Sequence, residues 1–143
     1  MKITQISVFL ENKSGRLYDA VSLLGKKKIN IRALTIAESE DYGILRLVVD
    51  KPALAAESLK KDGFVANITD IVAVEIADTP GGLAKVLGAL SKDKIDVEYM
   101  YAFVEKQSGK ALMVFRFENI DKAVRSLAKN KFVIVGKKEI QSL

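Results

Sequence analysis

The fold is decided by an eight-residue stretch, IADTPGGL at residues 76–83. It joins the end of an alternating apolar segment, a turn rich in Asp, Pro and Gly, and the first apolar residue of a helical pattern. A second copy, LENKSGRL, stands 66 positions earlier at residues 10–17. Asn12 and Asp78 occupy equivalent places in the two copies. Both stretches therefore predict a strand that turns sharply into a helix.

Each residue type in this turn has an expected role. The side chains of Asn12 and Asp78 can accept hydrogen bonds from backbone N–H groups two or three residues ahead, which a starting helix leaves open. Pro80 suits a first helical turn, and Gly15 and Gly81 let the backbone approach another group closely. The simplest interpretation is an ordinary connection from strand to helix.

The first half of the sequence indicates the element order β-α-β-β-α-β. Alternating or continuous apolar residues predict strands at residues 3–11, 29–36, 44–49 and 64–69. Helical spacing predicts one helix that buries Leu17, Ala20, Val21 and Leu24, and another that opens at Pro52 and buries Ala55, Ser58 and Leu59.

The same order then restarts. Apolar residues at 72–76 fall in the register of those at 6–10, again at an offset of 66, which becomes 68 beyond a hairpin with its tip at Ser108-Gly109. Agreement at so many positions indicates an internal repeat. We therefore predict an α+β fold of two tandem βαββαβ units, residues 1–70 and 71–143. Each unit is expected to form an antiparallel sheet with both helices on one face. Thr69-Asp70 is the expected link between the last strand of one and the first strand of the other.

The composition argues against several classes of protein. The chain has 143 residues, 49% of them hydrophobic, as in an ordinary globular protein. It contains neither Cys nor His, which removes thiolate nucleophiles, disulfides, the common transition-metal ligands and the usual acid–base group. We find no phosphate loop, nucleophile elbow, EF-hand or dinucleotide fingerprint. No catalytic site, cofactor or metal is predicted.

The predicted compartment and the net charge say less about function than the residue types do. Alternating residues begin directly after Met1-Lys2 and no long apolar run follows, so neither export nor membrane insertion is expected and the cytoplasm is the predicted compartment. The formal net charge of +5 does not by itself indicate a nucleic-acid partner.

The repeated pattern resembles the ACT domain, a small ligand-binding module of amino-acid-metabolising enzymes and some regulators. The likeness rests on a strand, an Asx-x-Pro/Ser-Gly-x-Leu turn, an amphipathic helix, and Ile-Asn/Asp-Ile/Val at the next strand start. It covers the chain as two tandem ACT-like repeats, similar to small ACT pairs that carry no catalytic domain. The resemblance implies that an amino acid binds between paired ACT units. The glycine loop of one unit and the second-strand start of its neighbour would hold it.

The resemblance assigns candidate ligand-binding residues by motif position. The first copy offers Asn12, Ser14, Gly15 and Asn30, and the second offers Asp78, Pro80, Gly81 and Asp96. Ser14 stands where the family usually has Pro, and the two Asp residues replace amides. The second copy has therefore lost donors for a carboxylate and gained acceptors for an ammonium group.

A further candidate, Tyr99, lies in a segment that is apolar on both alternate faces. Two roles remain open for it: packing in the core or between the repeats, or forming the wall of a ligand pocket.

The expected function is that of a non-catalytic, amino-acid-binding regulatory protein. Open N–H groups at a helix start suit a carboxylate, and Asn or Asp oxygens suit an ammonium group, so a free amino acid or similar zwitterion is the expected ligand. An enzyme of amino-acid metabolism and a second copy of the chain, giving a homodimer, are candidate partners.

Two alternatives stay open. In the first, the chain is a structural or interaction module whose glycine turns bind nothing. In the second, it is an RNA-binding protein, because RNA-recognition domains share the sheet topology and residues 109–117 faintly resemble their third strand. That match lacks aromatics at the main stacking positions, so nucleic acid is the less favoured partner.

Overall fold

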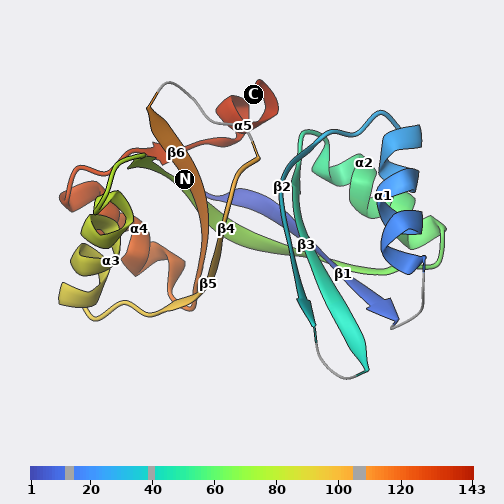
Figure 1. The fold of residues 1–143 in the computed structure, drawn as a ribbon, viewed down its shortest axis with the longest axis horizontal. Coiled ribbons are helices and arrows are strands. Elements are labelled where there is room, and N and C mark those ends of the chain that lie inside the picture. Colours follow the sequence, from blue (N-terminus) through green and yellow to red (C-terminus); the bar gives the residue numbers. More distant parts are fainter. Residues whose placement is uncertain (12–14, 39–40, 105–108) are drawn as a thin grey trace. The chain divides into compact units, whose positions relative to one another are not determined.

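The computed structural model describes residues 1–11, 15–38, 41–104 and 109–143. The chain forms two compact units, an N-terminal unit of residues 4–69 and a C-terminal unit of residues 70–141 together with Met1–Ile3 (Figure 1). In both, helices pack on an antiparallel sheet. No helix within the described ranges is long and apolar enough to cross a membrane.

The N-terminal unit has the strand order β2-β3-β1-β4. Its elements are β1 (Ile3–Glu11), α1 (Arg16–Lys26), β2 (Ile31–Glu38), β3 (Tyr42–Val49), α2 (Pro52–Lys61) and the first part of β4 (Val65–Ala77). Ile6 lies opposite Leu47 and Val8 opposite Leu45, and all four side chains are buried. They form one core with Ala20 and Leu24 of α1 and with Ala55 and Leu59 of α2.

The C-terminal unit repeats this arrangement with the strand order β5-β6-β4-β7. Its elements are the second part of β4, α3 (Gly82–Lys92), β5 (Val97–Ala102), β6 (Lys110–Phe117), α4 (Ile120–Lys129), β7 (Ile134–Val135) and α5 (Lys137–Gln141). Val72 lies opposite Phe115 and Val74 opposite Met113, the places that Ile6–Leu47 and Val8–Leu45 hold in the other sheet. The predicted α+β fold of tandem ferredoxin-like units is confirmed.

Several local predictions hold and others are wrong. α2 begins at Pro52 and buries Ala55, Ser58 and Leu59 as expected. Thr69 and Asp70 do not link two strands but lie inside β4, because no Gly or Pro interrupts the alternation between residues 64 and 77.

The predicted burial of Leu17 is also wrong. Its side chain is 43% exposed, and beside it the Arg16 guanidinium covers Phe64, 4.2 Å from the ring centroid. Its equivalent Leu83 packs partly buried against the core of the other unit. Helix α5 was not predicted, because a charged five-residue segment with Ile140 as its buried residue shows no helical periodicity.

Candidate functional site

The segment before α3 is a tight turn in which the Gly82 N–H donates to the Thr79 carbonyl oxygen over 3.0 Å. Gly81 has φ +83° and ψ −4°, the values of the third residue of a type II turn, and Pro80 takes the second place. Pro80 therefore precedes the helix, and its predicted place in the first helical turn is wrong. The left-handed Gly81 separates it from α3.

Helices α1 and α3 both begin at a glycine. Gly15 and Gly81 are the N-cap residues, and as glycines they supply no capping side chain of their own. The predicted capping of α3 by the Asp78 side chain stays a prediction, and Asn12 and Ser14 lie outside the described residues. Both N-cap glycines are exposed, and so are residues 78–80 before Gly81.

The close backbone approach expected at Gly15 and Gly81 occurs elsewhere. No described atom lies within 4 Å of the place of a Cβ at either residue, and both glycines are instead required by their positive φ. A Cβ at the neighbouring Gly82 would overlap the carbonyl oxygen of Ala77. Arg16 stands at the equivalent place before Leu17, so this constraint belongs to the second copy alone.

Asp96 and the Gly81 turn lie at opposite ends of one sheet. β4 ends at Ala77 beside the first residue of β6, whereas β5 begins, directly after Asp96, beside the last residue of β6. The eight residues of β6 span about 23 Å. The two candidate groups therefore do not meet within one unit.

In the N-terminal unit, the start of β2 is closed by polar contacts. The Asn30 N–H donates to the Asp50 carboxylate over 2.9 Å, and the Asp50 N–H donates to the Asn30 carbonyl oxygen over 3.1 Å. The Lys51 Nζ donates to the Lys28 carbonyl oxygen over 3.1 Å. The charged groups of Asp50 and Lys51 thus bind the loop that precedes β2.

The equivalent place in the C-terminal unit is a hollow of about 650 Å³. It lies between residues 94–96, which precede β5, and the start of α4. Its wall contains eight polar residues: Lys2, Lys94, Asp96, Arg116, Glu118, Asn119, Asp121 and Lys122. Of the predicted site residues that the structure describes, only Asp96 lines it. Within the described residues, no three or more His, Cys, Asp or Glu side chains gather in a way that could hold a metal ion.

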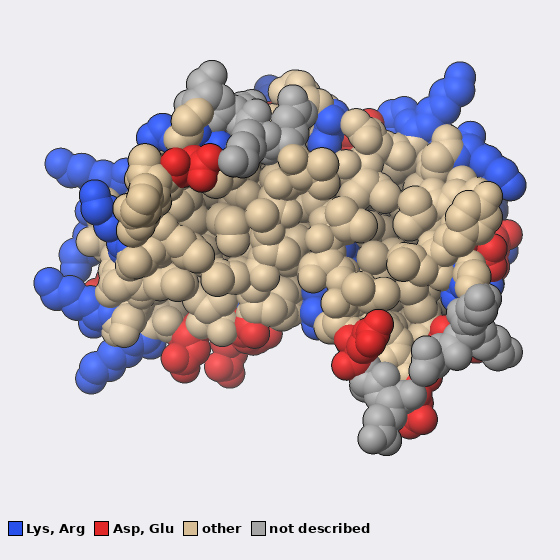
Figure 2. Space-filling model, viewed as in Figure 1, with Lys and Arg blue, Asp and Glu red and all other residues tan. Residues whose placement is uncertain are grey.

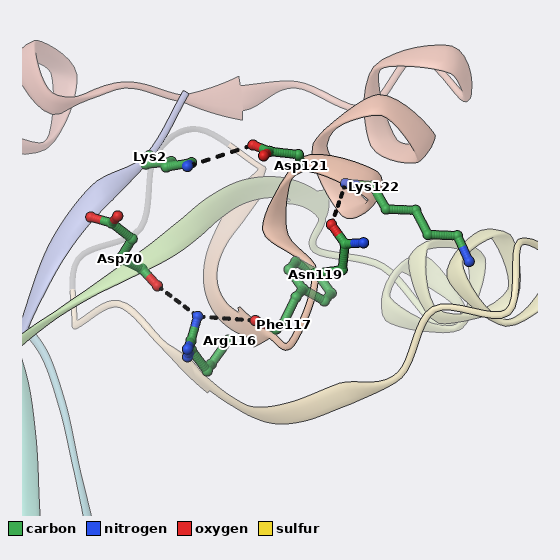
Figure 3. A network of polar contacts seen from close by, with 7 residues as sticks. All are labelled: Lys2, Asp70, Arg116, Phe117, Asn119, Asp121 and Lys122. Atoms are coloured by element: carbon green, nitrogen blue, oxygen red, sulfur yellow. Dashed lines mark hydrogen bonds and ion pairs between the residues drawn. The ribbon is translucent and has the colours of Figure 1, made fainter.

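Arg116 anchors one side of the hollow. Its Nη1 donates to the carbonyl oxygens of Asp70 over 3.3 Å and of Phe117 over 3.0 Å, as Figure 3 shows. Its Nε lies 3.9 Å from the Glu98 carboxylate, and the side chain is only 26% exposed. These contacts hold the guanidinium in one position.

The start of α4 forms the opposite side. The Asn119 Oδ1 accepts a hydrogen bond from the Lys122 N–H over 3.1 Å, and the Lys2 Nζ lies 3.5 Å from the Asp121 carboxylate (Figure 3). The Lys122 side chain extends away from the capping contact (Figure 3). Lys and Arg side chains also gather along the margin of the molecule over α3 and α4 (Figure 2). The exposed ones on these helices are Lys85, Lys92, Lys122, Arg125 and Lys129.

The aromatic residues lie outside this hollow. Tyr99 is half-buried in β5, and its ring stacks on that of Tyr101 with the centroids 6.5 Å apart. Phe115 and Phe117 of β6 stack on each other in the core and are fully buried. They are not available to stack on bases, which counts against RNA binding through this strand.

Comparison with known proteins decides the family. A model of the ACT domain pair matches residues 1–143. The chain belongs to the ACT domain pair family. None of the curated proteins matches this ACT pair. A crystal structure of a protein from Bacteroides thetaiotaomicron is 42% identical to it and has a TM-score of 0.93, over 100% of this chain and 98% of the other.

Two more distant structures share the fold of the ACT pair. The ligand-free regulatory subunit of aspartate kinase from Thermus thermophilus is 16% identical, with a TM-score of 0.63 over 90% of this chain and 92% of the other. The regulatory subunit of aspartate kinase from Thermus flavus is 18% identical, with a TM-score of 0.59 over 88% and 90%.

Sequence reasoning missed the charged wall of the hollow in this ACT pair. The signal that could have found it is the repeat itself, compared at the offset of 68. Buried Val48 of the first copy becomes Arg116 in the second, and Leu54 becomes Lys122. In the second copy a cationic residue thus replaces an apolar one on each side of the same loop. This difference indicates that the loop has another role in the second copy than in the first.

Proposed function

We propose that this ACT pair is a non-catalytic regulatory protein that binds a free amino acid at its glycine turns. One observation carries the proposal: α1 and α3 both begin at an exposed, left-handed glycine, which leaves the backbone at the helix start accessible. The positive end of the helix dipole and the N–H groups of a first helical turn suit a carboxylate. Helix α4, by contrast, has its first turn capped by Asn119.

The ammonium group of the ligand requires oxygen acceptors. Exposed Asn30 and Asp96 at the strand starts are the candidates. Because Asp96 lies at the far end of the sheet from the Gly81 turn, a complete site requires a second ACT unit, which a second copy of the chain in a homodimer would supply.

The regulated partner is proposed to be an enzyme of amino-acid metabolism. This choice is motivated by the two Thermus structures of the same fold, which are regulatory subunits of aspartate kinase. A cytoplasmic location belongs to the same proposal, and a sequence without cysteine is compatible with a reducing compartment.

A thermal-shift screen of the twenty amino acids tests the binding step. A ligand at a hundred times its dissociation constant adds about 2.7 kcal/mol to the free energy of unfolding. For a chain of this size that raises Tm by several degrees. Gly15→Asn and Gly81→Asn should remove the shift, because Asn tolerates a positive φ and adds bulk to the turn.

The matched control is Gly63→Asn. Gly63 also has φ +88°, and no described atom lies within 4 Å of the place of its Cβ, but it follows α2 and is not part of a glycine turn. It should change Tm without changing the ligand-induced shift. If no amino acid shifts the Tm of the wild type, the glycine turns are ordinary turns and the chain is a structural module.

A further inference from the structure

We propose that the hollow beside Asp96 is a second small-molecule site, separate from the glycine turns, and that it takes a zwitterion. Its ligand would carry an ammonium and a carboxylate close together, as an α-amino acid does. Every residue of its wall belongs to the C-terminal unit. The proposal therefore stands whether or not the glycine turns bind a ligand.

The first argument is the set of unpaired charges in the wall. The ammonium groups of Lys94 and Lys122 and the carboxylates of Asp96 and Glu118 make no hydrogen bond or ion pair with any residue that the structure describes. Two cations and two anions therefore share one wall without neutralising each other. Both signs remain available to a ligand that carries both.

The second argument is that the other polar residues of the wall already make contacts within the protein. The Arg116 guanidinium is held by two carbonyl oxygens, Lys2 pairs with Asp121, and Asn119 caps α4. Buried Ile95 and half-buried Ile120 complete the lining. Fixed neighbours keep the four unpaired groups around one space, which lowers the cost of ordering them around a ligand.

The third argument comes from the repeat, which supplies an internal comparison. In the N-terminal unit the same loop uses its carboxylate and its ammonium internally, through the contacts of Asp50 with Asn30 and of Lys51 with Lys28. In the C-terminal unit the carboxylate belongs to the longer Glu118, and Asn119 replaces the lysine. The carboxylate in the second copy therefore does not close the loop, and the ammonium group that does so in the first copy is absent.

Binding should be weak but selective. Exposed charged contacts each contribute little, so we expect dissociation constants on the order of 1 mM. Selectivity should come from the requirement for both charges, since a ligand with one charge leaves the opposite pair unused. The hollow has ample volume for an amino acid with a side chain.

The test is an NMR titration of the ¹⁵N-labelled full chain with each of the twenty amino acids. The amide signals of residues 94–98 and 116–122 should shift with at least one of them. The strongest binder is then compared with its decarboxylated amine and its deaminated acid, each of which should bind at least about fivefold more weakly. Equal binding of either analogue, or no shift of these amides with any amino acid, would overturn the proposal.

Matched variants locate the site. Lys94→Gln and Asp96→Asn should each weaken binding about threefold to fivefold. Lys28→Gln is the control, because Lys28 and Lys94 are equivalent, exposed and both at φ +58°, while Lys28 lies in the closed loop. Equal weakening by Lys28→Gln would contradict the proposal.

The glycine-turn variant separates the two sites. Residues 94–98 include Asp96 and would report both sites, so residues 116–122 are the ones that distinguish them. Gly81→Asn should leave the shifts of residues 116–122 unchanged even where it abolishes binding at the turn. If Gly81→Asn removes these shifts as well, the amides report the glycine-turn site and no second site exists.

Discussion

The carbonyl oxygen of Ala77 occupies the place that a Cβ of Gly82 would take. The last residue of β4 and the first residue of α3 are thereby brought together more closely than any side chain allows. Gly82→Ala must displace one of these two elements, and we expect it to lower the free energy of unfolding by about 3 kcal/mol. Urea unfolding of the two proteins measures the difference.

Gly88 provides the control on the same helix. It has a normal helical φ, and no described atom lies within 4 Å of the place of its Cβ. Gly88→Ala should raise the free energy of unfolding by about 0.5 to 1 kcal/mol, because alanine restricts the unfolded chain. Equal effects of the two substitutions would show that the contact with Ala77 imposes no constraint.

Ser126 of α4 is expected to matter more than its repeat equivalent, Ser58 of α2. The Ser126 hydroxyl donates to the Asp93 carboxylate over 2.5 Å and joins α4 to the end of α3. Both serines are 6% exposed, but the Ser58 hydroxyl makes no hydrogen bond with the described residues. Ser126→Ala should lower the free energy of unfolding by about 1.5 kcal/mol, since its acceptor is charged, and Ser58→Ala by less than about 0.5 kcal/mol.

Urea unfolding of Ser126→Ala, Ser58→Ala and the wild type measures the two losses of stability. The prediction requires a difference between them, because they share burial, helix position and the loss of one hydroxyl. A Ser58→Ala loss as large as that of Ser126→Ala would assign both effects to packing and none to the hydrogen bond with Asp93.

Lys131 and Gly63 occupy equivalent turns after α4 and α2, and both have a positive φ, +64° and +88°. Glycine adopts this conformation without the strain that a lysine Cβ introduces. Lys131→Gly should therefore raise the free energy of unfolding by about 1 kcal/mol, and the reciprocal Gly63→Lys should lower it by a similar amount. Thermal and urea unfolding should agree on the opposite signs, and equal signs would contradict the argument.

Much of the fold could be predicted because its signals are periodic. Alternating residues such as Ile6, Val8 and Leu10 recur at a constant offset in Val72, Val74 and Ile76, and the register of both sheets follows that offset. Periodicity cannot place a strand end within a continuous pattern. For that reason the sequence predicts a break at Thr69-Asp70, although β4 continues through both residues.

The turn before α3 shows a different limit of prediction from sequence. The residues Pro80 and Gly81 suit both the start of a helix and the centre of a type II turn, and only the backbone conformation distinguishes the two. The close contact of Gly82 with Ala77 joins two elements through their backbones, and no side-chain pattern encodes it.

The hollow beside Asp96 is harder still to predict from the sequence. It arises from contacts that Asn30, Asp50 and Lys51 make in one copy and their equivalents do not make in the other. Single exposed charges such as Lys94 and Glu118 follow no period and match no motif. Only the comparison of the two copies, position by position, indicates that a structural role has been exchanged.

The cap of α4 leads to the last prediction. Among the N-cap residues of α1 to α4, Gly15, Lys51, Gly81 and Asn119, only Asn119 makes a side-chain capping hydrogen bond, which it accepts from the Lys122 N–H. Asn119→Ala removes this acceptor and should lower the free energy of unfolding by about 1 kcal/mol. Asn119→Asp keeps an acceptor and places a negative charge at the positive end of the helix dipole, so it should stay within about 0.5 kcal/mol of the wild type. Urea unfolding at low salt measures both variants, and if Asn119→Asp loses as much stability as Asn119→Ala, the amide of Asn119 serves a purpose other than capping α4.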